Sequence, residues 1–275
     1  NGILGLDNIH MPAHILDRLR HAIHRPSGIV LVTGPTGSGK TTTLYAALSE
    51  LNTTEKKVIT VEDPVEYRLP GINQVQVHEK IDLSFERVLR SALRQDPDIV
   101  LVGEMRDQTT AEIGMRAALT GHMVLSTLHT NDAPSTLTRL MNMGVPTFNI
   151  ASSILLITAQ RLVRRLCTCK QKVEAPVETL LNAGFLESDL DGNWSLYGPG
   201  SCDRCKGNGY KGRVGVYQVM AVSEDIQRLI MGNGTALDIA EQARREGVND
   251  LRRSGLLKVK QGLTSLDEVL ANTNI

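Results

Sequence analysis

Short runs of apolar, mostly β-branched residues alternate with longer mixed segments along the first half of the chain. Four of these runs occupy residues 29–32, 58–61, 99–102 and 123–128. Each is too short for a typical helix and is bounded by glycine or polar residues, which favours buried strands. The intervals between the runs suit a crossover helix, so we predict a largely parallel sheet with helices on its faces.

Apolar residues at helical spacing stand on both sides of the first run. Before the run, Ile15, Leu16, Leu19 and Ile23 recur at intervals of about one turn, and a similar pattern begins at Leu44 after it. We therefore predict one helix near the start of the chain and another between the first two strands.

The segment between the first run and its helix is rich in glycine and hydroxyl residues. Residues 34–41 read GPTGSGKT and match the pattern G-x-x-x-x-G-K-[ST] at every position. Glycines permit positive φ and close approach, so backbone N–H groups can converge on phosphate oxygens at a helix N-terminus. Lys40 would reach the β- and γ-phosphates, and the Thr41 hydroxyl would bind Mg²⁺. The predicted nucleotide-binding residues of this phosphate loop are Gly34, Pro35, Thr36, Gly37, Ser38, Gly39, Lys40, Thr41 and Thr42.

Acidic and imidazole side chains stand next to the other three runs. They are Glu62, Asp63 and Glu66 around Pro64, Glu104 after the third run, and His122 and His129 on either side of the fourth. Taken singly, each is more simply explained as a solvated turn or a hydrogen-bonded histidine. Open α/β sheets bind ligands outside the carboxyl ends of their strands, so we expect these groups together beside the phosphate loop, as an active site.

Four segments resemble, in order, the Walker A, Asp box, Walker B and His box motifs of the ATPases of type II secretion and type IV pili. They are the phosphate loop, ITVEDPVEY, DPDIVLVGEMRD and GHMVLSTLHTNDAPSTLTRL, within residues 34–140. The third ends in Gly-Glu where the common motif has Asp. The resemblance implies a RecA-like P-loop NTPase that binds ATP or ADP with Mg²⁺.

The same resemblance implies roles for the acids and histidines. Glu66 is the candidate base that polarises the attacking water, Glu62 is the alternative base, and Glu104 is the acid that supports Mg²⁺. His122 and His129 would sense the γ-phosphate or couple it to a neighbouring subunit.

Four cysteines occur in two close pairs in the second half of the chain. Cys167 and Cys169 form a C-x-C pair, and Cys202 and Cys205 form a C-x-x-C pair. Two such pairs can close on one tetrahedral Zn²⁺, although C-x-C is one residue shorter than the usual spacing, and ordinary reduced thiols are the alternative. By resemblance, secretion and pilus-extension ATPases carry two C-x-x-C pairs here and retraction motors lack them.

Length and charge limit the remaining possibilities. We predict a RecA-like domain at residues 1–145 and a mainly helical region at 146–275, with a zinc-binding lobe at about 166–207. Lys plus Arg and Asp plus Glu both number 30, which argues against nucleic acid as a partner. No secretory signal or long apolar segment is evident, so we expect a cytoplasmic protein without direct membrane insertion. Because Asn1 opens the sequence in place of Met, we expect a fragment of a longer protein.

The resemblance implies a homohexamer that acts at the inner face of the inner membrane, with an inner-membrane platform protein and other pilus assembly proteins as partners. The closing segment is similar to PilB-like pilus-extension ATPases. Type II secretion is the nearer alternative, and a RecA-like DNA translocase or a module that binds ATP without hydrolysing it are more distant. Arg87, Arg90 and Arg94 share one face of a predicted helix and are candidates for a cation supplied to a neighbouring site, or for solvated side chains.

Overall fold

A computed structural model describes residues 4–81 and 84–273 of the chain, and for Glu79 it describes only the backbone. Residues 1–3, at the start of the predicted RecA-like region, and residues 274–275, at the end of the predicted helical region, lie outside the described residues. The strands are β1 (Gly28–Thr33), β2 (Val58–Glu62), β3 (Asn73–Gln76), β4 (Ile99–Val102), β5 (Met123–Leu128), β6 (Ile154–Leu166), β7 (Gln171–Lys172), β8 (Tyr197–Gly198) and β9 (Tyr210–Ala221). The α-helices are α1 (Ala13–Ile23), α2 (Lys40–Leu51), α3 (Phe85–Leu93), α4 (Gln108–Leu119), α5 (Ala133–Asn142), α6 (Thr147–Ser153), α7 (Val177–Ala183), α8 (Glu224–Met231), α9 (Ala236–Arg245), α10 (Leu251–Lys260) and α11 (Leu266–Asn272).

A seven-stranded sheet organises the molecule, in the order β3-β2-β4-β5-β1-β6-β9. Every neighbouring pair is parallel except β6 and β9, which run antiparallel. The predicted parallel sheet is therefore confirmed, and β1, which carries the phosphate loop at its end, lies between β5 and β6. The carboxyl ends of β2, β4, β5 and β1 consequently meet at one edge of the sheet.

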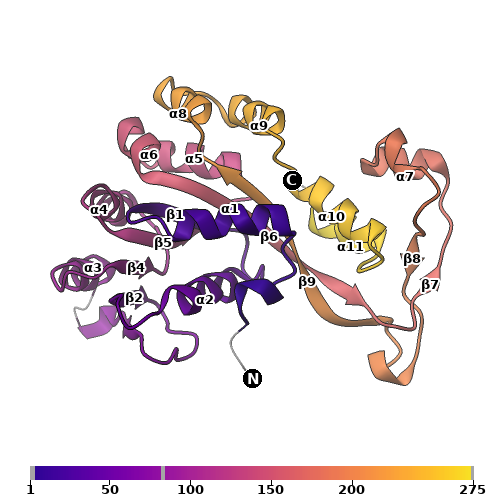
Figure 1. Cartoon of the computed structure of the whole chain (residues 1–275), viewed down its shortest axis with the longest axis horizontal. Helices are drawn as coiled ribbons and strands as arrows, with labels where there is room; N and C mark the ends of the chain where they lie inside the picture. The colour runs from indigo at the N-terminus through magenta and orange to yellow at the C-terminus, as the bar shows by residue number, and fades with distance from the viewer. Residues whose placement is uncertain (1–3, 82–83, 274–275) are drawn as a thin grey trace.

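Helices cover both faces of the sheet (Figure 1). Ile29 and Leu31 of β1 pack in the core formed with α3, α4, α5, α6, α8 and α9, whereas Val30 and Val32 pack in the core formed with α1 and α2. Alternate residues of a strand point to opposite faces, so a strand buried on both sides reads as a continuous apolar run. This explains why the short apolar runs predicted the central strands.

The sheet also contains strands that the hydrophobic pattern did not predict. The edge strand β3 has the sequence Asn-Gln-Val-Gln, and β6 and β9 belong to the region expected to be mainly helical. That region does contain α6 to α11, as predicted, but its two long strands extend the sheet beyond residue 145. The division of the chain into domains at residue 145 stays a prediction.

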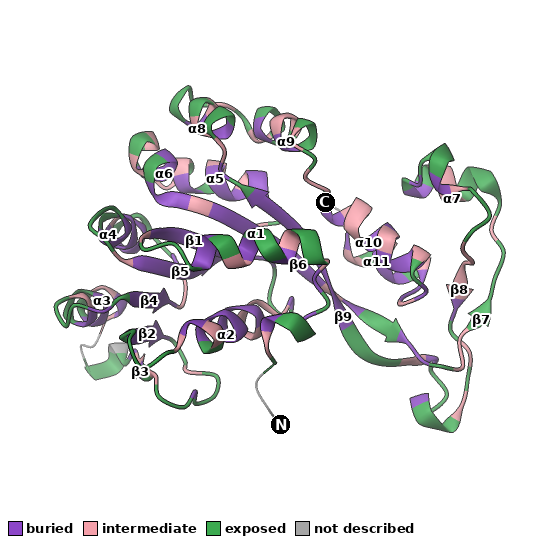
Figure 2. Cartoon of the chain, viewed as in Figure 1, coloured by how far each residue is buried: buried purple, intermediate pink, exposed green. Residues whose placement is uncertain are grey.

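A lobe formed by residues 167–209 lies at the end of the paired strands β6 and β9, away from the centre of the sheet (Figure 1). It contains α7 and the two-residue strands β7 and β8, which pair with each other. Figure 2 shows that buried residues concentrate in the sheet and its covering helices, whereas most of this lobe is exposed or half-buried. The lobe therefore has little core of its own.

A few contacts hold the lobe against the C-terminal helices. The rings of Phe185 and Trp194 stack with their centroids 5.1 Å apart and pack against Leu256 of α10. The carboxylate of Asp189, 5% exposed, accepts a hydrogen bond of 2.6 Å from Arg253. Hydrogen bonds from this guanidinium hold the pKa of Asp189 well below its usual range. Asp189 also pairs with Lys260 at 3.1 Å, so two ion pairs and the packing of the aromatic stack on Leu256 hold the lobe beside α10.

Candidate nucleotide-binding site and cysteine cluster

The phosphate loop connects β1 to α2, as the sequence predicts. Gly34, Gly37 and Gly39 have φ angles of 154°, 82° and 88°, a region that residues with a Cβ seldom adopt. Helix α2 begins at Lys40, so the loop precedes the positive end of a helix. The glycines are therefore required by backbone conformation, and the loop has the form that binds phosphate groups.

A cavity of about 510 Å³ opens beside this loop at the carboxyl edge of the sheet. It is lined by residues 36–42 of the loop and α2 together with Leu44, Tyr45, Glu62, Asp63, Pro64, Glu66, Tyr67, Phe85, Leu101, Gly103, Glu104, Arg106, Thr127 and His129. All the predicted catalytic residues line it. Gly34 and Pro35 are not among its lining residues, although the Gly34 carbonyl contacts Lys40.

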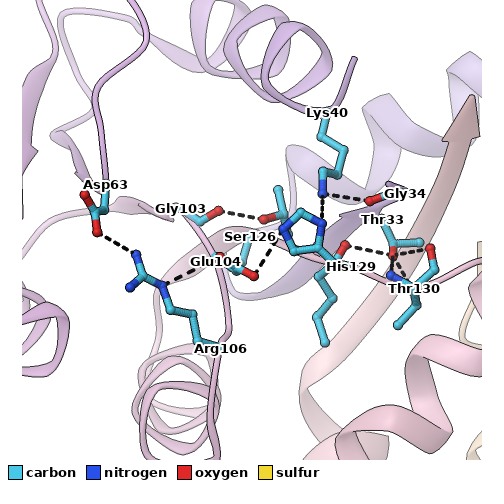
Figure 3. A network of polar contacts seen from close by, with 12 residues as sticks. Thr33, Gly34, Lys40, Asp63, Gly103, Glu104, Arg106, Ser126, His129 and Thr130 are labelled. Carbon is cyan, nitrogen blue, oxygen red and sulfur yellow. Dashed lines mark hydrogen bonds and ion pairs between the residues drawn. The ribbon is translucent and has the colours of Figure 1, made fainter. Parts of the chain in front are cut away.

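Lys40 lines this cavity and contacts polar groups beside it (Figure 3). Its ammonium donates to the Gly34 carbonyl at 2.7 Å and contacts Nδ1 of His129 at 2.8 Å. Burial lowers the pKa of Lys40 to about 8, an effect that Glu104 partly opposes. The ammonium is thus held beside the loop without a carboxylate in direct contact, as suits a group that receives phosphate.

A chain of charged contacts continues from His129 across the edge of the sheet (Figure 3). Nε2 of His129 lies 3.3 Å from Glu104, and the other carboxylate oxygen of Glu104 lies 3.6 Å from Arg106. Arg106 in turn donates to Asp63 at 3.0 Å. Side chains that follow β2, β4 and β5 therefore connect to Lys40 in one network.

Buried hydroxyl groups of β5 hold the loop that carries Glu104. Ser126 donates to the carbonyl of Val102 at 2.6 Å, and Thr127 donates to the carbonyl of Gly103 at 2.6 Å. These bonds satisfy carbonyls at the end of β4, where the ladder to β5 stops. The direction in which the chain leaves β4 is thereby fixed, and with it the place of Glu104.

Glu62 and Glu66, the two alternative bases, have different surroundings. Glu62 is 4% exposed, and its carboxylate accepts hydrogen bonds from Tyr45 and from Thr60 at 2.6 Å. Glu66 is exposed, and its carboxylate makes no hydrogen bond or ion pair with any residue that the structure describes. Tyr45 also accepts a hydrogen bond from the backbone N–H of Glu66 at 3.3 Å. Glu62 is engaged in holding its neighbours, whereas Glu66 lines the cavity and its carboxylate has no partner among the described residues.

His122 does not lie with the other predicted site residues. Its carbonyl accepts from the N–H of Gly28, at the start of β1, and its ring contacts the carbonyl of Ala117 at 2.9 Å. His122 precedes β5 and His129 follows it, so a six-residue strand separates them. In a parallel sheet the start of β5 lies at the edge opposite the phosphate loop, and the expectation that His122 would join this cavity is wrong.

Arg106 and Tyr45 are polar members of the site that were not predicted. Arg106 follows Glu104 by two residues, a position that appears from sequence to be an ordinary surface charge. Tyr45 lies among the apolar residues of α2 and is 1% exposed, so its pattern predicts a core residue. A buried tyrosine needs a hydrogen-bond partner for its hydroxyl, and this is the signal that could have connected Tyr45 to the predicted Glu62.

The donors around the cavity fit the Mg²⁺ that a nucleotide would bring. Thr41 and Glu104 both line it, and hydroxyl and carboxylate oxygens are the ligands that Mg²⁺ prefers. Lys40 stands nearby for the phosphates. The site thus combines phosphate-binding backbone, a cation and oxygen ligands in one cavity.

The four cysteines converge in the lobe. The sulfur atoms of Cys167 and Cys202 are 3.7 Å apart, and those of Cys202 and Cys205 and of Cys169 and Cys205 are each 3.8 Å apart. All four lie within 4.8 Å of one another. In a tetrahedral site with Zn–S bonds of about 2.3 Å, the sulfur atoms are about 3.8 Å apart. The cluster therefore has the geometry of a structural Zn²⁺ site despite its C-x-C pair.

Comparison with known sequences agrees with these motifs. Residues 1–271 match the family described as Type II/IV secretion system protein. The type IV pilus assembly ATPase PilB of Pseudomonas aeruginosa is 59% identical over 249 residues, which cover 90% of this chain and 44% of the relative. The type II secretion system protein HxcR of the same species is 47% identical over 272 residues, covering 99% of this chain and 54% of the relative. The chain spans about half the length of these relatives.

Solved structures resemble the fold over nearly the whole chain. The pilus retraction motor PilT with bound ADP aligns with a TM-score of 0.71 at 29% identity, covering 98% of this chain and 67% of that chain. The ATPase DotB of Legionella pneumophila aligns with a TM-score of 0.69 at 26% identity, covering 98% and 64%. The RecA-like P-loop fold expected from the sequence is therefore confirmed. Together with the match over residues 1–271, these likenesses show that the chain belongs to the Type II/IV secretion system protein family.

Proposed function

We propose that this chain is the ATP-hydrolysing part of a ring motor that powers type IV pilus assembly. The observation that carries the proposal is the joining of Lys40, His129 and Glu104 beside the phosphate loop, in a cavity of about 510 Å³. The identity of 59% to a pilus assembly ATPase supports this system over others.

Binding begins with the groups that suit phosphate. Backbone N–H groups of the loop and the Lys40 ammonium bind the β- and γ-phosphates of ATP. The Thr41 hydroxyl and the Glu104 carboxylate would hold Mg²⁺, which supplies charge neutralisation on the phosphates. Asp63 and Arg106 keep Glu104 in place through the ion pairs described above.

Glu66 is the carboxylate best suited to accept a proton from the attacking water. A general base must have a free acceptor within reach of the reacting group, and the Glu66 carboxylate lines the cavity without a partner in the described part of the chain. Glu62 supports it indirectly, because Tyr45 contacts both the Glu62 carboxylate and the Glu66 backbone.

His129 is placed to respond to the γ-phosphate. Its ring lies between Lys40 and Glu104. A phosphate group that takes over the Lys40 ammonium frees Nδ1 of His129, so the ring can change partners when ATP binds. His122 lies at the opposite edge of the sheet, so the role that remains for it in this proposal is coupling to a neighbouring subunit.

We propose further that the motor is a homohexamer that works with an inner-membrane platform protein. Arg87, Arg90 and Arg94 lie on the exposed side of α3, and Arg90 pairs with Glu86 of the same helix at 3.1 Å. They are candidates for cations offered to a neighbouring subunit. Within the described residues, no helix is long and apolar enough to cross a membrane, so in this proposal contact with the membrane is made through partners.

The four cysteines are proposed to hold one structural Zn²⁺ as thiolates. Three of their sulfur pairs are 3.7 to 3.8 Å apart and all four sulfur atoms lie within 4.8 Å of one another, which suits the ion, and the lobe around them has few buried residues. The cluster is part of the lobe and is separate from the residues that line the nucleotide cavity.

A type II secretion ATPase is the second candidate. Its support is the identity of 47% to HxcR over 272 residues. The chemistry at the phosphate loop would be the same, so the two candidates differ in the machine that the ring drives.

Steady-state ATP hydrolysis, measured together with the mass of the particle in solution, tests the proposal. We expect hydrolysis that depends on Mg²⁺, is not stimulated by DNA and disappears in Lys40→Ala. Hydrolysis that requires DNA would favour a translocase, and ATP binding without hydrolysis would favour a nucleotide-gated module. Wild-type protein that binds no ATP would overturn the proposal.

A further inference from the structure

A buried glutamine of β6 bridges the phosphate loop and the helix that follows it. Gln160 is 1% exposed. Its side-chain Nε2 donates to the carbonyl of Ser38 at 2.8 Å, and its Oε1 accepts from the hydroxyl of Thr43 at 2.8 Å. The NH₂ group of the side-chain amide therefore bonds to the loop, and its carbonyl oxygen bonds to α2.

We propose that Gln160 is a positioning residue that sets the orientation of the phosphate loop for nucleotide binding. The inference rests on the proposed function, since it assigns a role in the binding step of that reaction. Gln160 itself does not line the nucleotide cavity and touches no reacting group.

The planarity of the peptide bond explains how Gln160 acts. The carbonyl of Ser38 and the N–H of Gly39 belong to one peptide unit, and in a trans peptide they point in opposite directions. A donor on the Ser38 carbonyl from the side of β6 thus turns the Gly39 N–H away from β6. This N–H belongs to the loop whose backbone groups bind phosphate, so Gln160 fixes the direction of a phosphate donor.

The bond to Gln160 connects Ser38 of the loop to the sheet. The Ser38 N–H donates to Pro35 within the loop at 3.2 Å. Its hydroxyl oxygen is buried and has no hydrogen-bond partner in the described part of the chain. Loss of the Gln160 amide would leave the Ser38 carbonyl buried without a hydrogen-bond donor. An unsatisfied buried carbonyl costs more free energy than the loss of a hydrogen bond at the surface. Rotation of the peptide would relieve this cost.

Two glycines of the loop leave the space that this arrangement needs. A Cβ on Gly39 would come within 3.1 Å of Nε2 of Gln160. A Cβ on Gly34 would come within 2.7 Å of the backbone carbonyl oxygen of Gln160. Both glycines also have positive φ. They therefore serve close packing against β6 in addition to backbone conformation.

The chain offers a matched control in Gln218 of β9. Gln218 pairs with Ala159, the residue before Gln160, and is 6% exposed. Its Oε1 accepts from the N–H of Ala133 at 2.9 Å, at the start of α5, and not from a residue of the phosphate loop. Leucine at either position removes one buried amide from the same pair of strands, but only Gln160→Leu releases the loop.

The test measures binding of fluorescent ADP with Mg²⁺, and its displacement by inorganic pyrophosphate, in the full chain. Gln160→Leu is expected to weaken both by about 10- to 100-fold, the range for losing a hydrogen bond that involves a charged group. Gln218→Leu should lower the melting temperature about as much as Gln160→Leu does and leave both affinities within about twofold of wild type, since its amide bonds to Ala133 and not to the loop. Thr43→Val removes the other bond of Gln160 and should weaken binding in the same direction, by less.

The double variant Gln160→Leu/Thr43→Val distinguishes positioning from general destabilisation. If Gln160 and Thr43 act through one bridge, the fold-loss of affinity in the double variant is smaller than the product of the fold-losses in the two single variants. Affinities in Gln160→Leu and Thr43→Val that match Gln218→Leu would overturn the inference while leaving the proposed function intact. Wild-type protein that binds neither ADP nor pyrophosphate would overturn both.

Discussion

The phosphate-loop edge and the cysteine lobe both bring together side chains that are far apart in the sequence, but different structures support them. Lys40, Glu104 and His129 follow or precede elements of a sheet that is buried on both faces. The four cysteines lie in loops attached to two-residue strands and 3₁₀ turns. The first arrangement is fixed by packing in the sheet and by hydrogen bonds such as those of Ser126 and Thr127.

This difference predicts which region depends on its ligand for folding. Residues of the nucleotide cavity are positioned by β1, β2, β4 and β5, so we expect the backbone around them to fold without a bound ligand. The lobe buries few side chains, and a small structure with little core generally needs a metal or another cross-link. We therefore expect the Zn²⁺ to be needed for the structure of the lobe and to be dispensable for the nucleotide site.

The largest effect is expected for loss of the metal. Cys202→Ser should abolish Zn²⁺ binding and unfold the lobe locally, because structural zinc contributes about 10–16 kcal/mol of apparent binding free energy in small domains. ADP affinity should stay near that of the wild type, since the sheet does not require the lobe. Elemental analysis, melting temperature and ADP titration of the same samples measure the three quantities.

Ser201→Ala, next to the cluster, provides the control for substitution in this loop and should retain one zinc per chain. A metal-free wild type with the same melting temperature would show that the cysteines are plain thiols. A large loss of ADP affinity in Cys202→Ser would instead show that the lobe communicates with the phosphate loop, and the contrast between the two regions would fail.

A second contrast exists within the nucleotide cavity, between the engaged Glu62 and the unpaired Glu66. Glu66→Gln should bind ATP normally and hydrolyse it about 10²- to 10⁴-fold more slowly, the usual scale for loss of a general base. Glu62→Gln should reduce stability more than it reduces the rate, because its carboxylate accepts two short hydrogen bonds in the core. Single-turnover hydrolysis and thermal unfolding of both variants make the comparison. The opposite pattern would make Glu62 the base.

The smallest effect concerns pH and Lys40. Burial lowers the pKa of this ammonium to about 8. As pH rises through that value, Lys40 loses its charge, so ATP affinity should fall by up to about tenfold per pH unit. Between about pH 8 and 10, Lys40 is more protonated in the unfolded chain than in the folded protein. Its contribution to the free energy of unfolding therefore increases as pH rises over that range when no nucleotide is bound.

Titration of ATP affinity and thermal unfolding between pH 7 and 10 measure these opposite trends. Lys40→Met removes the titrating group and should bind weakly with little dependence on pH. A wild-type affinity that is constant through pH 9 would show that Lys40 keeps its proton in the free protein.

The central strands and the phosphate loop could be predicted from sequence because their residues are determined locally. A strand buried on both faces must be apolar throughout, and β4 and β5 have the predicted limits. The loop needs glycine at positions of positive φ, so its pattern is visible without the fold. The cysteine cluster was predictable for a similar reason, since few other residue types bind zinc in this way.

The remaining features depend on contacts that no local pattern contains. Strand β3 lies at the edge of the sheet with one buried residue, Gln74, so it has no apolar run to detect. The apolar half of β6 is followed by arginines, and its length alone does not distinguish strand from helix. Arg106 and Gln160 obtain their roles from partners more than 40 and 120 residues away. His122 was predicted at the wrong edge of the sheet, because it precedes β5 whereas His129 follows β5, and the two ends of a strand lie at opposite edges.

The paired ends of β6 and β9 also bear on how such proteins can diverge. Leu166 lies opposite Tyr210, and the N–H of Cys167 donates to the carbonyl of Gly209 at 2.9 Å. The chain therefore leaves and re-enters the sheet at neighbouring points, which a short hairpin turn can join. A chain without residues 167–209 could therefore keep the pairing of β6 and β9, provided that Leu256 and its neighbours on α10 were polar where the lobe no longer covered them.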